Sequence, residues 1–207
     1  MTRLVLASTS PRRKVILKRL GLPFSVEDPG NVETIHGVGE LVMVKNALAK
    51  ARSVAQNNRD ALVLAADTSI IFNQRIIGKP KGKEDARQIL QLLSGHSHQV
   101  VSGVAVIVNN SRELSDSSIT RVWLRDISSE EIQWYLDTKE GIGKAGAYAI
   151  QGKGGMFVER IDGCYFNVVG LPLSLTVKLL ERAGLDMFGK TDVKMSEYTP
   201  GETSNTQ

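Results

Sequence analysis

The chain has 207 residues, a formal net charge of +4, 42% hydrophobic and 23% charged residues, an ordinary composition for a globular protein with a sizeable core. Its single cysteine, Cys164, excludes an intramolecular disulfide framework and a cysteine-rich zinc site, and favours the cytoplasm. No window resembles a signal peptide or is apolar enough to cross a bilayer, so we expect no membrane partner. The basic residues are scattered, which favours a small anionic ligand over stable nucleic-acid binding.

The first third of the chain predicts alternating strands and helices. Residues 4–7 and 24–26 are strand candidates, and residues 41–55 have helical spacing. Between the strands, Ser10 and Pro11 stand at the positions of an N-cap and a first helical residue, and Gly21 closes the helix. Its apolar stripe would consist of Val15, Ile16, Leu17 and Leu20.

The middle of the chain predicts longer strands. Residues 61–72 read as a strand buried on both faces and interrupted by polar residues at 67–69, with a short return strand within 73–80. A helix at 84–93 precedes a strand at 98–110 that ends in a hairpin turn at Asn109 and Asn110. The next strand is predicted at 119–124, and Ser128 begins a capped helix.

The last third is rich in glycine up to about residue 172, which predicts loops and short strands before a final helix at 173–183. From about residue 189 the periodicity is lost, so we predict one domain, residues 1–188, and a polar, mobile tail, residues 189–207. Strands and helices alternate at first and strands dominate later. This order predicts an α/β fold with a mixed sheet.

The sequence STSPRR, residues 8–13, lies where the first strand meets the first helix. A helix N-terminus offers unpaired N–H groups and partial positive charge, and so binds anions. The hydroxyl groups of Ser8 and Ser10 and the guanidinium groups of Arg12 and Arg13 suit phosphate oxygens. The alternative is a capped surface helix with solvated arginines.

Asp67 stands within an otherwise apolar strand. A buried carboxylate must be paired, bound to a metal, or placed at a cleft, where it can act as a general base. The alternative is a structural aspartate that caps a turn with Thr68. Lys79 follows the same strand in a Gly-Lys-Pro turn, and Lys50 lies on an apolar helix, where a lysine usually extends its side chain to solvent.

Gln151 stands between an apolar segment and glycines, where its amide could pair with the edge of a nucleobase because it both donates and accepts. Glu33, in the loop after the second strand, could simply be solvated. The spacing of a Walker phosphate-binding loop, the dinucleotide-binding glycine pattern, the zinc-protease motif and the nucleophile elbow of α/β-hydrolases are all missing.

Six short motifs taken in order resemble one family: ASTSPRR, ADT, GKP, SGHSHQV, KAGAYAIQG and VVGLP, within residues 3–183. Together they are similar to the Maf-type nucleoside triphosphate pyrophosphatases, also described as septum-formation inhibitors. The resemblance implies an elongated mixed sheet with flanking helices and two lobes around a central cleft, as in inosine triphosphate pyrophosphatases. It also implies hydrolysis of a nucleoside triphosphate to the monophosphate and pyrophosphate, a divalent metal ion (Mg²⁺, Mn²⁺ or Co²⁺) and a homodimer.

The resemblance also implies roles for individual residues. Asp67 falls on the proton acceptor, and Glu33 and Asp67 on the metal ligands. The phosphate-binding positions of the family correspond to Ser8, Arg12, Arg13, Lys50 and Lys79. Arg12, Thr68 and Gln151 agree with the subgroup that acts on dTTP and UTP, as part of nucleotide-pool housecleaning. The sequence departs from the family where alanine replaces glycine at Ala65 and Ala149, beside the expected site.

Two other functions are compatible with parts of this pattern. A nucleic-acid-binding regulator of septum formation would use the net positive charge, but the aromatic content is only 5% and no basic stripe is evident. A phosphomonoesterase acting on nucleotides would release orthophosphate instead of pyrophosphate. The reaction products distinguish these alternatives.

Overall fold

The computed structural model describes residues 3–32 and 39–186, which form a mixed α/β structure. Its elements are, in chain order, β1 (Arg3–Ala7), α1 (Pro11–Lys18), β2 (Phe24–Glu27), α2 (Glu40–Ala55), β3 (Ala61–Phe72), β4 (Arg75–Ile77), α3 (Lys83–Leu93), β5 (Ser97–Val108), β6 (Arg112–Leu124), α4 (Ser129–Asp137), the 3₁₀ turns η1 (Ala145–Ala147) and η2 (Lys153–Phe157), β7 (Val158–Asp162), α5 (Tyr165–Val169) and α6 (Leu173–Arg182). The predicted fold class is confirmed.

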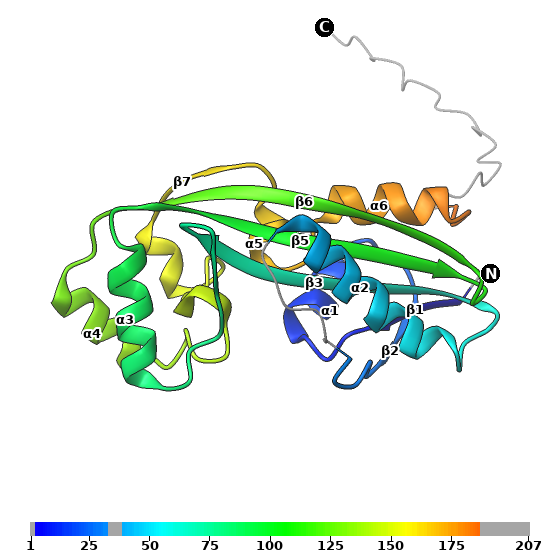
Figure 1. Cartoon of the computed structure of the whole chain (residues 1–207), viewed down its shortest axis with the longest axis horizontal. Coiled ribbons are helices and arrows are strands. Elements are labelled where there is room, and N and C mark those ends of the chain that lie inside the picture. Colours follow the sequence, from blue (N-terminus) through cyan, green and yellow to red (C-terminus); the bar gives the residue numbers. More distant parts are fainter. Residues whose placement is uncertain (1–2, 33–38, 187–207) are drawn as a thin grey trace, which may run out of the picture.

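The strands form one sheet in the order β2-β1-β3-β5-β6-β7, with β4 paired to β3. β1 runs parallel to β2 and β3, whereas the other pairings are antiparallel. The long strands β3, β5 and β6 run along an elongated molecule, with α3 and α4 near one end, α1, α2 and α6 along the other half, and α5 between the two groups (Figure 1). One lobe carries α1, α2 and α6, and the other carries α3 and α4.

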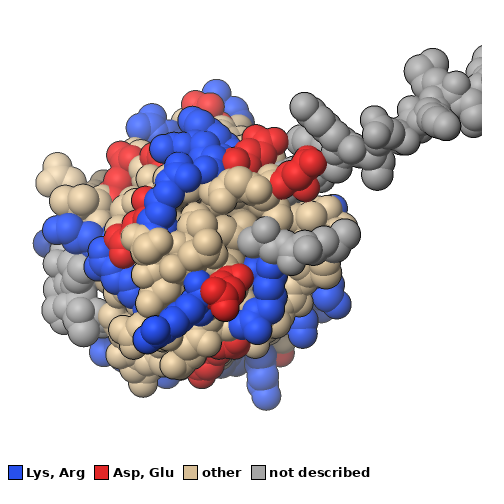
Figure 2. Space-filling view, turned by 90° about the vertical axis from the view of Figure 1, so that its right-hand side faces the viewer, with Lys and Arg blue, Asp and Glu red and all other residues tan. Residues whose placement is uncertain are grey.

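Charged side chains are distributed over the surface in both signs. Figure 2 shows the end of the molecule at which the chain begins, where lysines and arginines alternate with acidic and uncharged residues. A group of lysines and arginines lies in the upper part of this view, with acidic residues on either side of it. None of the helices in the described part of the chain combines the length and the apolar character needed to span a bilayer.

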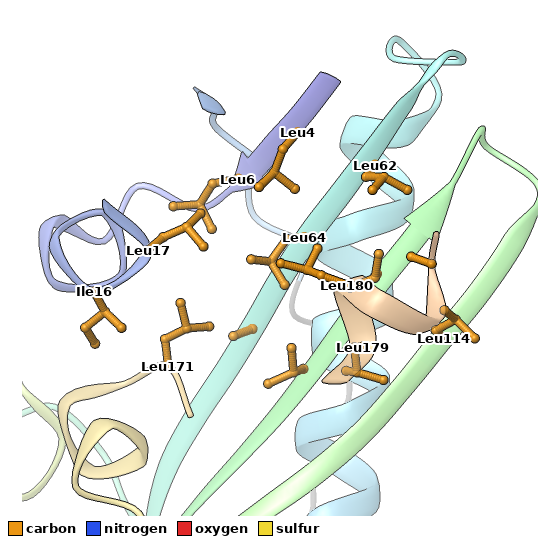
Figure 3. Packing of buried hydrophobic residues seen from close by; sticks show 14 of the residues in the cluster. Leu4, Leu6, Ile16, Leu17, Leu62, Leu64, Leu114, Leu171, Leu179 and Leu180 are labelled. Atoms are coloured by element: carbon orange, nitrogen blue, oxygen red, sulfur yellow. The ribbon is translucent and has the colours of Figure 1, made fainter. Parts of the chain in front are cut away.

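The first lobe has two cores, one on each face of the sheet, because alternate residues of β1, β3 and β5 point to opposite faces. On one face, leucines of β1 and β3 pack against α1 and α6 (Figure 3). On the other face, small residues of the same strands pack against α2, which presents Ala47, Ala51 and Val54. The second lobe has its own core, in which α3 and α4 pack on the far ends of β3, β5 and β6.

Most predicted elements are confirmed, including the turn at Asn109 and Asn110, where both residues have positive φ, and the capping box of Ser128 and Glu131. The first helix was predicted too long, since it ends at Lys18, and Val15 is exposed rather than part of the stripe. The strand predicted at 119–124 begins at Arg112, because its ladder with β5 extends through polar residues that face outward. The helix α5 was not predicted. The predicted tail, residues 189–207, lies outside the described residues.

Candidate active site

The central strand β3 leaves part of one edge uncovered. Its parallel pairing with β1 ends at Leu64, and its antiparallel pairing with β4 begins at Ile70. Residues 65–69 therefore lack a ladder partner on this edge among the described strands. A cleft of about 1220 Å³ opens here and reaches from the α1 and α2 side to the segment 143–151 of the other lobe. The break in strand pairing places the polar residues of β3 in a cavity between the lobes.

Asp67 lies at this break and is paired on both carboxylate oxygens. Lys50 Nζ lies 2.7 Å from Asp67 Oδ1, and Asn46 Nδ2 donates to Oδ2 at 3.0 Å. All three residues are buried, with 8% of Asp67 exposed. Asn46 and Lys50 are four residues apart on one face of α2, so both reach the same carboxylate. The Lys50 ammonium therefore lies against Asp67 instead of extending to solvent, and the carboxylate does not merely cap a turn.

The close approach of α2 to the sheet depends on Gly103. This residue stands opposite Asp67 in the β3–β5 ladder. A Cβ atom at this position would overlap the backbone of Met43 and Val44 in α2. The glycine therefore lets the helix come near enough for Asn46 and Lys50 to reach Asp67.

Arg13 connects the start of α1 to two other segments. Its guanidinium donates to the carbonyl of Gly170 at 2.9 Å, to Ser8 Oγ at 3.3 Å and to Thr68 Oγ1 at 3.3 Å. Thr68 Oγ1 also lies 2.7 Å from Ser102 Oγ. Ser8 Oγ accepts from the backbone N–H of Ser10, whose own side chain makes no capping hydrogen bond in the described structure. Arg13 and Thr68 are thus engaged with protein atoms beside the cleft.

Arg12 points its charge into the same cleft from α1. Its Nε is buried and has no hydrogen-bond partner among the described residues, and burial lowers the pKa of its guanidinium. Burial also lowers the pKa of Lys144, and the charge of Arg12 lowers it further, although Glu140 acts in the opposite direction. Lys79 is exposed at the rim, in a turn whose Gly78 carbonyl accepts from the N–H of Gly146. Together with Arg13 and Lys50, these three residues bring the described cations that line the cavity to five, an arrangement that attracts a polyanion.

The opposite wall carries Gln151, Tyr148 and Ala149. Gln151 is exposed, so its amide is available to a ligand in the cleft. Tyr148 is buried, and its hydroxyl lies 2.9 Å from His98 Nε2. Burial lowers the pKa of His98 to about 4, so the ring is neutral at pH 7.

The oxygen donors of the cleft decide whether it could bind the expected divalent metal ion. The described residues hold no cluster of three acidic, histidine or cysteine side chains, and Glu33 lies outside them. Asp67 is the buried carboxylate of the cleft, and Asn46 Oδ1 beside it is buried without a hydrogen-bond partner. Hard divalent cations accept carboxylate and amide oxygens and take further ligands from phosphates and water. The residues present fit an ion held largely by its substrate.

Most of the sequence-predicted site residues lie together in the structure. Asp67, Lys50, Ser8, Arg12, Arg13, Lys79, Thr68 and Gln151 all line one cleft, although they come from five separate segments. Sequence reasoning missed Asn46 and Lys144, which line it too. The signal for Asn46 was a polar residue four positions before Lys50 on an apolar helix face. The signal for Lys144 was a lysine at the start of the KAGAYAIQG motif.

Comparisons with known proteins match most of the sequence. The family described as Maf-like protein matches residues 3–183. The dTTP/UTP pyrophosphatase of Methanosarcina barkeri is 43% identical over 194 residues, which span 91% of this chain and 98% of that protein. The protein of the same name from Bacillus anthracis is 42% identical over 189 residues, or 90% of this chain and 98% of its own length.

Solved structures match a smaller part of the chain. The Ham1 protein of Staphylococcus aureus is 16% identical with a TM-score of 0.44, and a HAM1 protein from Coxiella burnetii is 22% identical with a TM-score of 0.42. Each alignment covers 60% of this chain and 73% of the other. The family match and both pyrophosphatase relatives, in contrast, span most of the sequence. This chain belongs to the Maf-like protein family.

Proposed function

We propose that this protein hydrolyses dTTP and UTP to the nucleoside monophosphate and pyrophosphate. The observation that carries the proposal is the buried Asp67 carboxylate at the break in the sheet, which faces a cleft lined by cations from both lobes. The relatives named dTTP/UTP pyrophosphatase support it, since they match over nine tenths of the chain.

The triphosphate would lie at the N-terminus of α1. Arg12 offers a guanidinium group whose Nε has no hydrogen-bond partner within the described ranges, and Lys144 and Lys79 face it from the other lobe. Ser8 and the first N–H groups of α1 add neutral donors. Charge-assisted hydrogen bonds of this kind hold phosphate oxygens firmly and orient them. Arg13 would hold the shape of this end of the cleft through its hydrogen bonds to the Gly170 carbonyl and Thr68 Oγ1.

Asp67 would accept a proton from a water molecule. As the water oxygen attacks the α-phosphorus, the bond to the bridging oxygen breaks and pyrophosphate leaves on the opposite side. Lys50 and Asn46 hold the carboxylate in one orientation, and each of its oxygens retains a further lone pair for the water. Most of the acceleration would come from positioning and from the surrounding positive charge, as in phosphoryl transfer generally.

A divalent cation would be held by Asp67 and the Asn46 amide oxygen together with phosphate oxygens, with Glu33 as a further candidate. When bound, it would polarise the phosphoryl group and offset the charge that develops on the pyrophosphate. Asn46 Oδ1 supports this assignment, because it is buried without a hydrogen-bond partner in the described part of the chain, and such an acceptor is costly.

The base would lie toward Gln151 on the opposite wall. A side-chain amide can donate to a carbonyl of a pyrimidine ring and accept from its ring N–H at the same time. Ala149, two residues before Gln151, is buried and also lines the cleft. We expect this end to set the choice between pyrimidines and purines.

A product analysis tests the reaction. The protein is incubated with dTTP, UTP, CTP and GTP in ¹⁸O-labelled water, and the products are separated and their masses measured by mass spectrometry. We expect monophosphate and pyrophosphate from dTTP and UTP, with the label in the monophosphate, because water attacks the α-phosphorus. Label in pyrophosphate would contradict the assigned point of attack, and release of orthophosphate would indicate a phosphomonoesterase or phosphatase instead.

The face of the molecule in Figure 2 gives no support to the alternative of a nucleic-acid-binding regulator. Acidic residues flank the basic residues on this face, and the cations Arg12 and Lys144 lie within a cleft. Duplex DNA requires an accessible basic patch. The same preparation should therefore bind random duplex DNA weakly, and steeply salt-dependent binding without any turnover would favour the regulator.

A further inference from the structure

The wall that carries Gln151 has little regular structure to hold it. Between α4 and β7 the chain forms only the two short turns η1 and η2, in which Gly146 departs from helical φ and ψ. Lys144, Tyr148 and Gln151 nevertheless line the cleft from this segment. Its shape must therefore be fixed by contacts other than a helix or a strand ladder.

Glu140 supplies several of these contacts. Its Oε1 accepts from the backbone N–H of Lys153 at 3.0 Å, and its Oε2 accepts from the N–H of Gly154 at 3.0 Å. Its backbone carbonyl accepts from Lys144 Nζ. One residue thus ties down the segment both before and after Gln151.

Tyr135 completes the arrangement from α4. Its hydroxyl donates to Glu140 Oε2 at 2.8 Å and accepts from the N–H of Ala149 at 3.1 Å. The ring is fully buried and packs edge-on against Phe157. Because Ala149 stands two residues before Gln151 and Lys153 two residues after it, the Tyr135–Glu140 pair holds the backbone on both sides of the glutamine.

The local glycines fit this pair. A Cβ at Gly152 would overlap the Glu140 carboxylate, and a Cβ at Gly154 would come within 2.8 Å of the Tyr135 hydroxyl oxygen.

The Glu140 carboxylate is also kept charged. Burial alone would raise the pKa of Glu140, but the hydrogen bonds from Gly154, Lys153 and Tyr135 and the charge of Lys144 outweigh it and leave the pKa lowered.

We propose that Glu140 and Tyr135 are positioning residues that set nucleobase selectivity by holding the backbone on either side of Gln151. Neither belongs to the described residues that line the cleft, so they act through Gln151 and not on the nucleotide. The inference rests on the proposed function, in which Gln151 contacts the base. It adds the residues that fix where that contact is made.

The test measures kcat and KM for dTTP and for GTP by pyrophosphate release. In Glu140→Gln the amide retains one acceptor oxygen and cannot accept from both N–H groups, so we expect the dTTP/GTP ratio of kcat/KM to fall about tenfold, as for one lost hydrogen bond. Tyr135→Phe keeps the ring packing on Phe157 and should lower the ratio less, about threefold.

A matched control is Glu131→Gln in the same lobe. Glu131 also accepts from a backbone N–H, that of Ser128, and pairs with Arg125, but it is absent from the described lining of the cleft. It should lower stability and leave the dTTP/GTP ratio unchanged. A general loss of structure would change kcat for both nucleotides alike, whereas loss of positioning changes their ratio.

A double-mutant cycle decides whether Glu140 acts through the glutamine. In a Gln151→Ala background, Glu140→Gln should have almost no further effect on the ratio, because the group that it positions is gone. Equal effects in both backgrounds would overturn the inference, as would an unchanged ratio in both Glu140→Gln and Tyr135→Phe while Gln151→Ala changes it. Those results leave the proposed function standing, whereas a wild-type protein that releases no pyrophosphate from any triphosphate refutes both.

Discussion

The two walls of the cleft are held together by different kinds of interaction. On the first wall, Asp67, Lys50 and Asn46 project from β3 and α2 and bond to one another through their side chains. On the second wall, the backbone around Gln151 bonds to the side chains of Glu140 and Tyr135. The first wall positions its groups by regular structure, and the second by hydrogen bonds to a loop.

This difference predicts how each wall responds to substitution. Replacing a side chain on the first wall removes a chemical group but leaves the helix and strand where they are. Replacing a tether on the second wall releases a segment of chain, so binding and selectivity change more than the chemical step. A glycine permits the close approach on each wall, Gly103 under α2 and Gly152 over Glu140.

The largest effect is expected from Asp67→Asn. The amide is nearly isosteric and can still contact Lys50 and Asn46, but it cannot take a proton from water, so kcat should fall by about 10³-fold. The nucleotide dissociation constant, measured by calorimetry without a divalent cation, should change little, because the phosphate-binding side chains remain. Asp60→Asn, at an exposed position just before β3, is the control. Turnover near the wild-type rate would exclude Asp67 as the base.

A stability effect should follow from Gly103→Ala. Its methyl group would overlap the backbone of Met43 and Val44, so α2 must move away from β5 at a cost of about 1–3 kcal/mol. Chemical denaturation measures the free energy of unfolding. Gly82→Ala is the control, because a Cβ there meets no atom within 4 Å among the described residues and the backbone is extended. Equal unfolding midpoints for the two variants would show that the helix accommodates the methyl group.

The second wall is probed by Lys144→Gln. Loss of one charge facing the phosphates should raise KM for dTTP about tenfold with little change in kcat, as for one charge-assisted contact. Lys153→Gln is the control, since that ammonium lies over the ring of Trp134, 5.5 Å from its centroid. An equal increase of KM in both variants would mean that Lys144 contributes only general positive charge.

The sequence predicted the first wall better than the second, and the reason is physical. Apolar periodicity predicts a regular strand and helix, so an interrupting Asp67 or Lys50 stands out. Asn46 was missed because a single polar residue on a helix face is usually solvated. The burial of α2 against Gly103 depends on the tertiary structure and changes that expectation.

For the second wall, the glycines predicted only loops and short strands. The conformation of residues 140–154 follows from bonds between Glu140, Tyr135 and backbone N–H groups, which no local pattern encodes. The same limit applies to β6, whose polar first half is a strand because β5 offers it a continuous ladder. The order of the family motifs predicted that Gln151 belongs to the site, but it did not predict the contacts of Glu140 and Tyr135 that position it.

The smallest effect concerns His98, which supports the second wall through Tyr148. Its pKa is lowered to about 4 by burial, whereas an unfolded histidine titrates near 6.5. The unfolded state therefore binds more protons below pH 6.5, and stability falls as the pH is lowered from there toward 4. Between pH 7 and 5.5 we expect a loss of about 1 kcal/mol that is absent in His98→Gln, whose amide can still bond to the Tyr148 hydroxyl. Denaturation of both proteins at each pH measures the difference, and parallel pH profiles would mean that His98 becomes protonated without cost in the folded protein.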